Sequence, residues 1–168
     1  MFNFKMAGFY MLKICFLGFL THASLAQGSL EPKLNVYQYK LENLFRFSWV
    51  NTHSFVGQPS IWVSFQPNCT SCTTQLKSLS CLPKQIRKVA LGIRGSQDEL
   101  AKILRSLPFE GEKLLSSPEF LRDFSLAATP TILVVSAEGQ LQKKMIGVTE
   151  CETLKSYFKN EKNYSTGE

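Results

Sequence analysis

The chain lacks the runs of basic residues that mark a nucleic-acid-binding surface. Its 168 residues carry 19 Lys and Arg against 13 Asp and Glu, a formal net charge of +6. The basic residues are nonetheless scattered, and the densest groups are the doublets Arg87-Lys88 and Lys143-Lys144. A nucleic-acid patch gathers about five to eight Lys and Arg in one short run. We therefore expect no nucleic-acid partner.

Metal ligands are also scarce. Of the two histidines, only His53 lies outside residues 1–26. The five cysteines include one C-x-x-C pair, Cys69 and Cys72, and no second pair of Cys or His has the spacing of a zinc site. Because a structural zinc ion takes four such ligands, we expect no metal and no organic cofactor. A periplasmic metal-binding protein stays open as an alternative.

Repeats and low-complexity segments are absent, and no apolar run after the amino terminus exceeds the length of a buried strand. Hydrophobic residues make up 44% of the chain and charged residues 19%. This composition supports a packed core and excludes intrinsic disorder. The length indicates one domain with a short appendage.

Residues 1–26 have the features of a secretory signal peptide. Lys5 and Lys13 are their only charged side chains, an apolar run covers residues 14–20, and small residues precede position 27. A basic start, an apolar centre and a small-residue exit define such a leader. The apolar stretch 6–20 is shorter than the ~20 residues that cross a bilayer. We expect cleavage and export to the periplasm or beyond, with an uncleaved membrane anchor as the alternative.

The rest of the chain divides into an N-terminal extension at residues 27–43, a folded domain at 44–159 and a polar tail at 160–168. Hydrophobic patterns predict strands within the domain at 61–65, 89–93, 132–135 and 141–146, and a half-buried strand or hairpin at 44–50. Helical spacing and capping residues predict helices at 72–82, 96–107, 117–124 and 149–158.

The order of these elements defines the fold class as α/β. Strands that alternate with helices form parallel pairs. The short link Glu138-Gly139 instead joins two antiparallel strands. We therefore expect a mixed central sheet with helices on both faces.

Cys69 and Cys72 are the residues most suited to chemistry. They follow the strand at 61–65 and open a helix, so Cys69 lies at or just before a helix N-terminus. Free amides and the helix dipole favour an anion there and lower the pKa of a cysteine. Thiolate attack on a disulfide, followed by attack of a second thiol on the mixed disulfide, requires such a pair. A purely structural disulfide remains the alternative.

No Asp or Glu occurs between Glu42 and Asp98, whereas this stretch contains six Lys and Arg. With no carboxylate close in sequence to raise it, the pKa of Cys69 should lie well below the ~8.5 of a free cysteine. A solvated basic face is the simpler explanation of the same charges.

These motifs resemble the thioredoxin superfamily, most closely its exported TlpA/ResA-like branch, over about residues 44–158. The resemblance rests on the strand leading into Cys69 and Cys72, on Thr129-Pro130-Thr131 before an apolar strand, on Glu138-Gly139 and on Gly147. It implies a thioredoxin-like fold with a cis peptide bond at Pro130 facing the cysteine pair. It also implies that the backbone of Thr129 pairs with a substrate strand.

The sequence departs from the family pattern close to the cysteines. Asn68 replaces the aromatic residue that usually precedes the first cysteine, and Ser64 stands where classical thioredoxins have a buried acid. The two residues between the cysteines are Thr70 and Ser71, and neither is the proline that is common there in the family. Neither the redox potential nor the direction of electron flow therefore follows from the resemblance.

The other two cysteines of the predicted domain are Cys81 and Cys151. In the implied fold, Cys81 lies nine residues beyond Cys72, about 13 Å along a continuous helix, whereas Cys151 opens the last helix. Their Cα atoms would then exceed the ~7 Å that a disulfide spans. We expect partly buried thiols, with a disulfide as the alternative if the chain kinks near Pro83.

Together these expectations describe an exported enzyme, a thiol–disulfide oxidoreductase. Cys69 would attack, Cys72 would resolve, and Thr129 and Pro130 would bind the substrate. The expected partners are cysteine-containing exported proteins and a membrane redox partner, with transient membrane association left open, and we expect a monomer. A non-catalytic binding module on the same fold is the main alternative.

Overall fold

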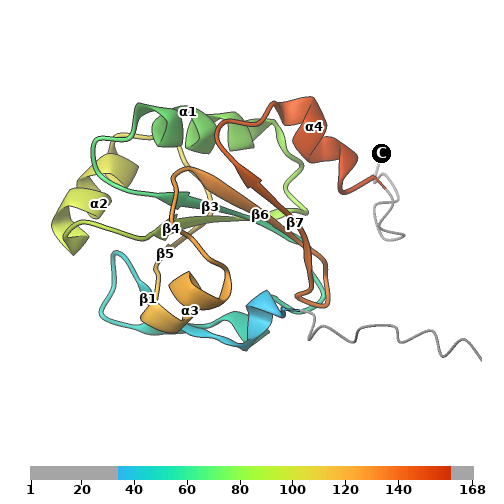
Figure 1. The fold of residues 1–168 in the computed structure, drawn as a ribbon, viewed down its shortest axis with the longest axis horizontal. Helices are drawn as coiled ribbons and strands as arrows, with labels where there is room; N and C mark the ends of the chain where they lie inside the picture. The colour runs from blue at the N-terminus through green and yellow to red at the C-terminus, as the bar shows by residue number, and fades with distance from the viewer. Residues whose placement is uncertain (1–33, 160–168) are drawn as a thin grey trace, which may run out of the picture. The chain divides into compact units, whose positions relative to one another are not determined.

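A mixed β-sheet forms the centre of the molecule in our computed structural model, which describes residues 34–159 (Figure 1). The predicted leader at residues 1–26 and tail at 160–168 lie outside the described residues. Within the described range the sheet has seven strands in the order β2-β1-β5-β4-β3-β6-β7. The strands are β1 (Lys40–Asn43), β2 (Trp49–Asn51), β3 (Ser60–Phe65), β4 (Arg87–Gly92), β5 (Glu112–Leu115), β6 (Thr131–Val135) and β7 (Leu141–Ile146).

Four α-helices and three short 3-10 helices accompany the sheet in the described range. They are α1 (Thr70–Ser78), α2 (Gln97–Arg105), α3 (Pro118–Asp123) and α4 (Cys151–Ser156), with η1 (Val36–Gln38), η2 (Thr52–Phe55) and η3 (Leu79–Cys81). β3 runs parallel to β4 and antiparallel to β6. The predicted combination of parallel and antiparallel pairs is therefore confirmed.

Two hydrophobic cores lie on opposite faces of the sheet because successive strand side chains alternate. Ile61, Val63 and Phe65 of β3 join the core that contains residues of α1, α2 and α4. Trp62 joins the other core, which contains Phe120 of α3 and the N-terminal segment. All six residues of β3 are buried. Helices cover both faces, as predicted (Figure 1).

The N-terminal hairpin is placed differently from our prediction. Residues 44–48 form a turn, while β1 and β2 flank it at Lys40–Asn43 and Trp49–Asn51. Of the two predicted alternatives, a single strand at 44–50 is therefore wrong, whereas a hairpin is present but starts earlier, so that the sheet begins within the segment that we assigned to the extension. Aromatic residues at positions 45, 47 and 49 imitated strand alternation, but all three are exposed.

Helix starts were predicted with mixed success. The capping box of α2 is present, with Ser96 and Glu99 bonded reciprocally, and Ser117 caps α3. The helix predicted to begin at Thr149 has Glu150 as its N-cap instead, and Glu150 makes no side-chain capping bond. The Thr149 N–H instead donates to Gln75 Oε1 of α1 at 2.6 Å.

Cys81 and Cys151 form a disulfide, with Cα atoms 6.3 Å apart. Our expectation of free thiols is wrong because it assumed one continuous helix from Cys72 to Cys81. The α-helix ends at Ser78, and the chain turns through η3 before reaching Cys81. The bridge therefore joins the end of this segment to the first residue of α4.

None of the helices in the described part of the chain combines the length and apolar character that crossing a bilayer requires.

Candidate redox site

The site begins where β3 ends and α1 starts. The chain turns through Asn68, whose φ of 57° lies in the left-handed region that Asn tolerates better than most residues. Cys69 follows as the N-cap of α1, and its Sγ accepts the backbone N–H of Cys72 at 3.2 Å. The first sulfur therefore lies against the free amides of a helix N-terminus, as the sequence predicted.

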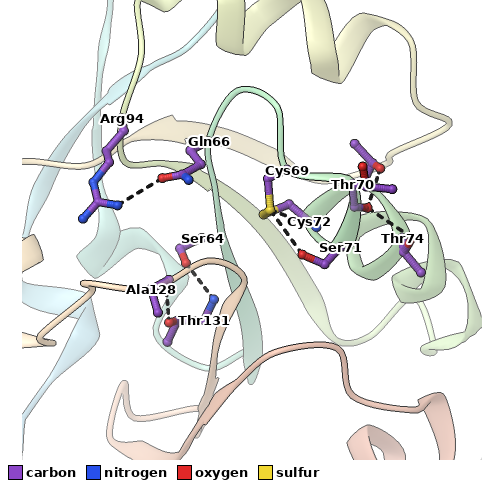
Figure 2. Close-up of a disulfide and its surroundings, with 11 residues drawn as sticks. Ser64, Gln66, Cys69, Thr70, Ser71, Cys72, Thr74, Arg94, Ala128 and Thr131 are labelled. Atoms are coloured by element: carbon purple, nitrogen blue, oxygen red, sulfur yellow. Dashed lines mark hydrogen bonds between the residues drawn. A yellow bond between two sulfur atoms is a disulfide. The ribbon is translucent and has the colours of Figure 1, made fainter.

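Cys69 and Cys72 are joined in a disulfide, with Cα atoms 5.2 Å apart (Figure 2). The two residues differ in accessibility, because Cys69 is partly exposed whereas Cys72 is 1% exposed. The hydroxyl of Ser71 lies 3.4 Å from Cys69 Sγ. An incoming group can therefore approach the Cys69 residue, while the core covers Cys72.

The Thr129–Pro130 peptide bond is cis, which confirms the conformation that the family resemblance implied. Pro130 is buried directly before β6, and its carbonyl accepts the N–H of Gly147 at 2.8 Å. The antiparallel register pairs Val63 of β3 with Ile132 of β6. The start of β6 therefore lies beside the end of β3, next to the turn that carries Cys69 (Figure 2).

Ser64 stands where classical thioredoxins have a buried acid, and its side chain links the end of β3 to the start of β6. Its side chain is buried, and its Oγ accepts the N–H of Thr131 at 2.8 Å. The Thr131 hydroxyl in turn donates to the Ala128 carbonyl at 2.7 Å. Ser64 thus fixes the first residue of β6 and, through it, the loop that ends in Pro130.

We expect Ser64→Ala to lower the free energy of unfolding by about 1–3 kcal/mol, because it leaves a buried backbone donor without its partner. Urea unfolding would measure this change. Ser80→Ala is the matched control, since it removes an exposed hydroxyl and should alter stability by no more than ~0.5 kcal/mol. Equal effects of the two substitutions would contradict this role.

Arg94 and Gln66 border the site, although the sequence alone did not indicate them. The Arg94 guanidinium donates to Gln66 Oε1 at 3.2 Å (Figure 2). It also donates to the Ala127 carbonyl at 3.0 Å. It therefore ties the loops after β3 and β4 to the loop before Pro130. Both residues follow the carboxyl ends of adjacent parallel strands, and such ends meet at one sheet edge. That topological rule could have identified them.

A shallow hollow of about 370 Å³ lies beside Cys69, lined by Asn68, Cys69, Thr70, Thr73 and Ile103. Its lining is uncharged. Within residues 34–159, no group of three or more His, Cys, Asp or Glu side chains could hold a metal ion. The reactive groups that this arrangement brings together are the sulfurs of Cys69 and Cys72.

The reduced form of Cys69 should be ionised more readily than a free cysteine. The helix N-terminus and the Cys72 N–H stabilise the thiolate. We expect its pKa to lie well below ~8.5, so its alkylation rate should remain high as the pH falls through neutrality. The measurement is the rate of iodoacetamide reaction against pH in the Cys72→Ser variant.

The bonded Cys81 and Cys151 provide an internal control in that experiment, because they carry no free thiol. Replacing Cys69 by Ser as well should remove the reaction of the folded protein. A midpoint at or above the ~8.5 of a free thiol would show that the helix terminus does not stabilise the thiolate.

The topology and the cysteine pair together define this as a thioredoxin-like domain. No family model and no curated protein matches the sequence, whereas the fold is similar to that of solved structures. The chain is similar to a thiol:disulfide interchange protein of the thioredoxin family from Chlorobium tepidum, with TM-score 0.63 and 13% identity over 74% of this chain and 95% of that one.

Two further structures are similar. StoA from Bacillus subtilis has a TM-score of 0.59 and 16% identity, covering 71% of this chain and 95% of that one. An uncharacterized thioredoxin-like protein from Porphyromonas gingivalis has a TM-score of 0.57 and 23% identity, covering 73% and 86%. The thioredoxin-like fold that the sequence motifs indicated is therefore confirmed.

Proposed function

We propose that this protein is an exported thiol–disulfide oxidoreductase that exchanges disulfides with cysteines of other exported proteins. The observation that carries the proposal is the asymmetry of the cysteine pair. Cys69 is accessible and caps a helix, while Cys72 is buried within reach of it. Similar structures described as thiol:disulfide interchange proteins support the same activity.

In the reducing direction, the Cys69 thiolate attacks a substrate disulfide. One substrate sulfur forms a mixed disulfide with Cys69, and the other leaves as a thiolate that takes up a proton. The deprotonated Cys72 sulfur then attacks Cys69 Sγ, which forms the Cys69–Cys72 disulfide and releases the second substrate thiolate. Oxidation of a substrate dithiol is the same sequence in reverse. A membrane redox partner would restore the starting form of the enzyme.

Thr129 and Pro130 are proposed as the substrate-binding edge. Among the main-chain hydrogen bonds of residues 34–159, none uses the N–H or C=O of Thr129. A peptide segment next to Cys69 could therefore pair with this backbone, as an added strand does at a sheet edge. Gly147 holds the Pro130 carbonyl and keeps the loop in place.

The direct test measures the rate of disulfide exchange between the protein and a peptide disulfide. A second measurement gives the reduction potential of the Cys69–Cys72 pair. A potential near ~−270 mV would make the protein a reductant, and one near ~−120 mV would make it an oxidant. The Cys69→Ser, Cys72→Ser double variant is the control. Exchange no faster than that of this control would overturn the proposal and favour a binding module.

A further inference from the structure

The turn between β1 and β2, together with the first residue of β2, presents aromatic side chains to solvent. Phe47 is 100% exposed, Trp49 is 66% exposed and Phe45 is 39% exposed. We call these three residues the aromatic turn. Large aromatic residues normally bury most of their surface, and clusters of exposed ones mark interaction sites. Neither the fold nor the proposed disulfide exchange accounts for this cluster.

The aromatic turn is held in one conformation by its own backbone contacts. The Asn43 side chain accepts the N–H groups of Phe45 at 2.9 Å and Arg46 at 3.0 Å. The Asn43 N–H donates to the Ser48 carbonyl at 2.9 Å. The aromatic side chains therefore project from an ordered support, which reduces the entropy lost when they bind a surface.

Basic side chains surround the aromatic turn. The guanidinium of Arg105 lies 5.3 Å from the Phe45 ring centroid, and the Lys113 ammonium lies 5.7 Å from it. Arg46 is exposed within the turn itself. The carboxylate on the hairpin is Glu42, which lies opposite Trp49. The turn thus combines aromatic rings with an excess of positive charge.

We propose that the aromatic turn docks on the surface of a membrane that contains anionic lipids. Trp and Phe side chains partition to the headgroup region, and adjacent Lys and Arg bind lipid phosphates. Without the predicted leader, which carries Lys5 and Lys13, the chain keeps 17 Lys and Arg against 13 Asp and Glu, and this net charge of +4 favours approach to an anionic surface. A fully exposed ring such as Phe47 can enter this soft layer without a preformed pocket.

This surface lies on the α2 side of the domain (Figure 1). Gln97 of α2 donates to the Leu44 carbonyl at 3.0 Å, next to the aromatic turn. Ile103 of the same helix lines the hollow beside Cys69. A docked turn would therefore keep the cysteine pair close to the bilayer surface. The docking itself does not depend on the proposed redox activity.

Trp49 provides a local probe for the test, because the other tryptophan, Trp62, is fully buried. The exported protein is mixed with vesicles of phosphatidylcholine alone and of phosphatidylcholine with an equal part of phosphatidylglycerol, each prepared with brominated acyl chains. We expect a blue shift and quenching of Trp49 on the anionic vesicles, both reduced by added salt.

Phe47→Ser should weaken partitioning to anionic vesicles roughly tenfold, because it removes a large apolar side chain from the contact. Arg46→Gln should reduce the preference for anionic vesicles. Val56→Ser is the matched control, since Val56 is exposed but lies outside the turn. Phe47→Ser should leave disulfide exchange in solution unchanged, which separates this test from that of the proposed function.

Two results would overturn the proposal. If neither kind of vesicle changes the emission of Trp49, no membrane contact forms, and the aromatic turn would then be assigned to a protein partner. Equal partitioning of Phe47→Ser and the unmodified protein would show that binding uses another surface.

Discussion

Cys69→Ser should abolish disulfide exchange, whereas Cys72→Ser should accumulate mixed disulfides between Cys69 and its substrates. Removing the attacking thiolate eliminates the first covalent step, so we expect a loss of roughly a thousandfold or more. Removing Cys72 leaves that step intact but prevents resolution. The structure supports this difference because Cys69 is partly exposed and Cys72 is 1% exposed.

Non-reducing electrophoresis of extracts from cells that produce each variant would measure the trapped species, and mass spectrometry would identify the bound proteins. Cys69→Ser, Cys72→Ser is the control for adventitious disulfides. The role assignment fails if Cys72→Ser traps no more protein than this double variant. Mixed disulfides accumulating in Cys69→Ser would instead make Cys72 the attacking residue.

Cys81→Ser, Cys151→Ser should lower the free energy of unfolding by about 4 kcal/mol. The bridge joins residues 70 positions apart, so its loss restores much conformational freedom to the unfolded chain. The pair is also partly buried, at the junction of η3 with α4. We therefore expect a marked fall in the urea midpoint of the oxidised protein.

The Cys69→Ser, Cys72→Ser variant is the comparison for this effect. Its bridge spans a separation of 3 residues, so the same entropic argument assigns it about half as much stabilisation. A loss below about 1 kcal/mol on removing Cys81–Cys151 would show that native-state strain cancels the entropic gain.

Much of the sheet was predictable because its central strands are buried on both faces. The runs at 61–65 and 132–135 consist of apolar residues with one polar interruption, and they were recognised. β5 was missed because only Leu114 of its four residues is buried, so its sequence has no clear pattern. In the first hairpin the error was the opposite one: the alternating aromatic residues indicated a strand at 44–50, where the structure has a turn.

The sequence predicted the part of the candidate site that lies within one short segment. Strand, turn and helix start are contiguous around Cys69, and Pro130 was indicated by the resemblance to the thioredoxin superfamily. The hydrogen bonds of Ser64 to Thr131 and of Arg94 to Ala127 span large sequence separations. No local pattern records such contacts, so they required the fold.

The position of the Cys81–Cys151 bridge also has a consequence for biogenesis. Cys151 follows β7, the last strand, so the loop closed by this bridge contains β4, β5, β6 and β7. Cys69 and Cys72, by contrast, can pair as soon as a short segment of the chain has emerged. The long-range bridge can close natively only after the sheet has assembled around β3. Formation of this bridge therefore marks, by a covalent bond, that the chain has finished folding. Premature pairing of Cys81 with Cys69 or Cys72 is the error that a disulfide-correcting system would have to reverse.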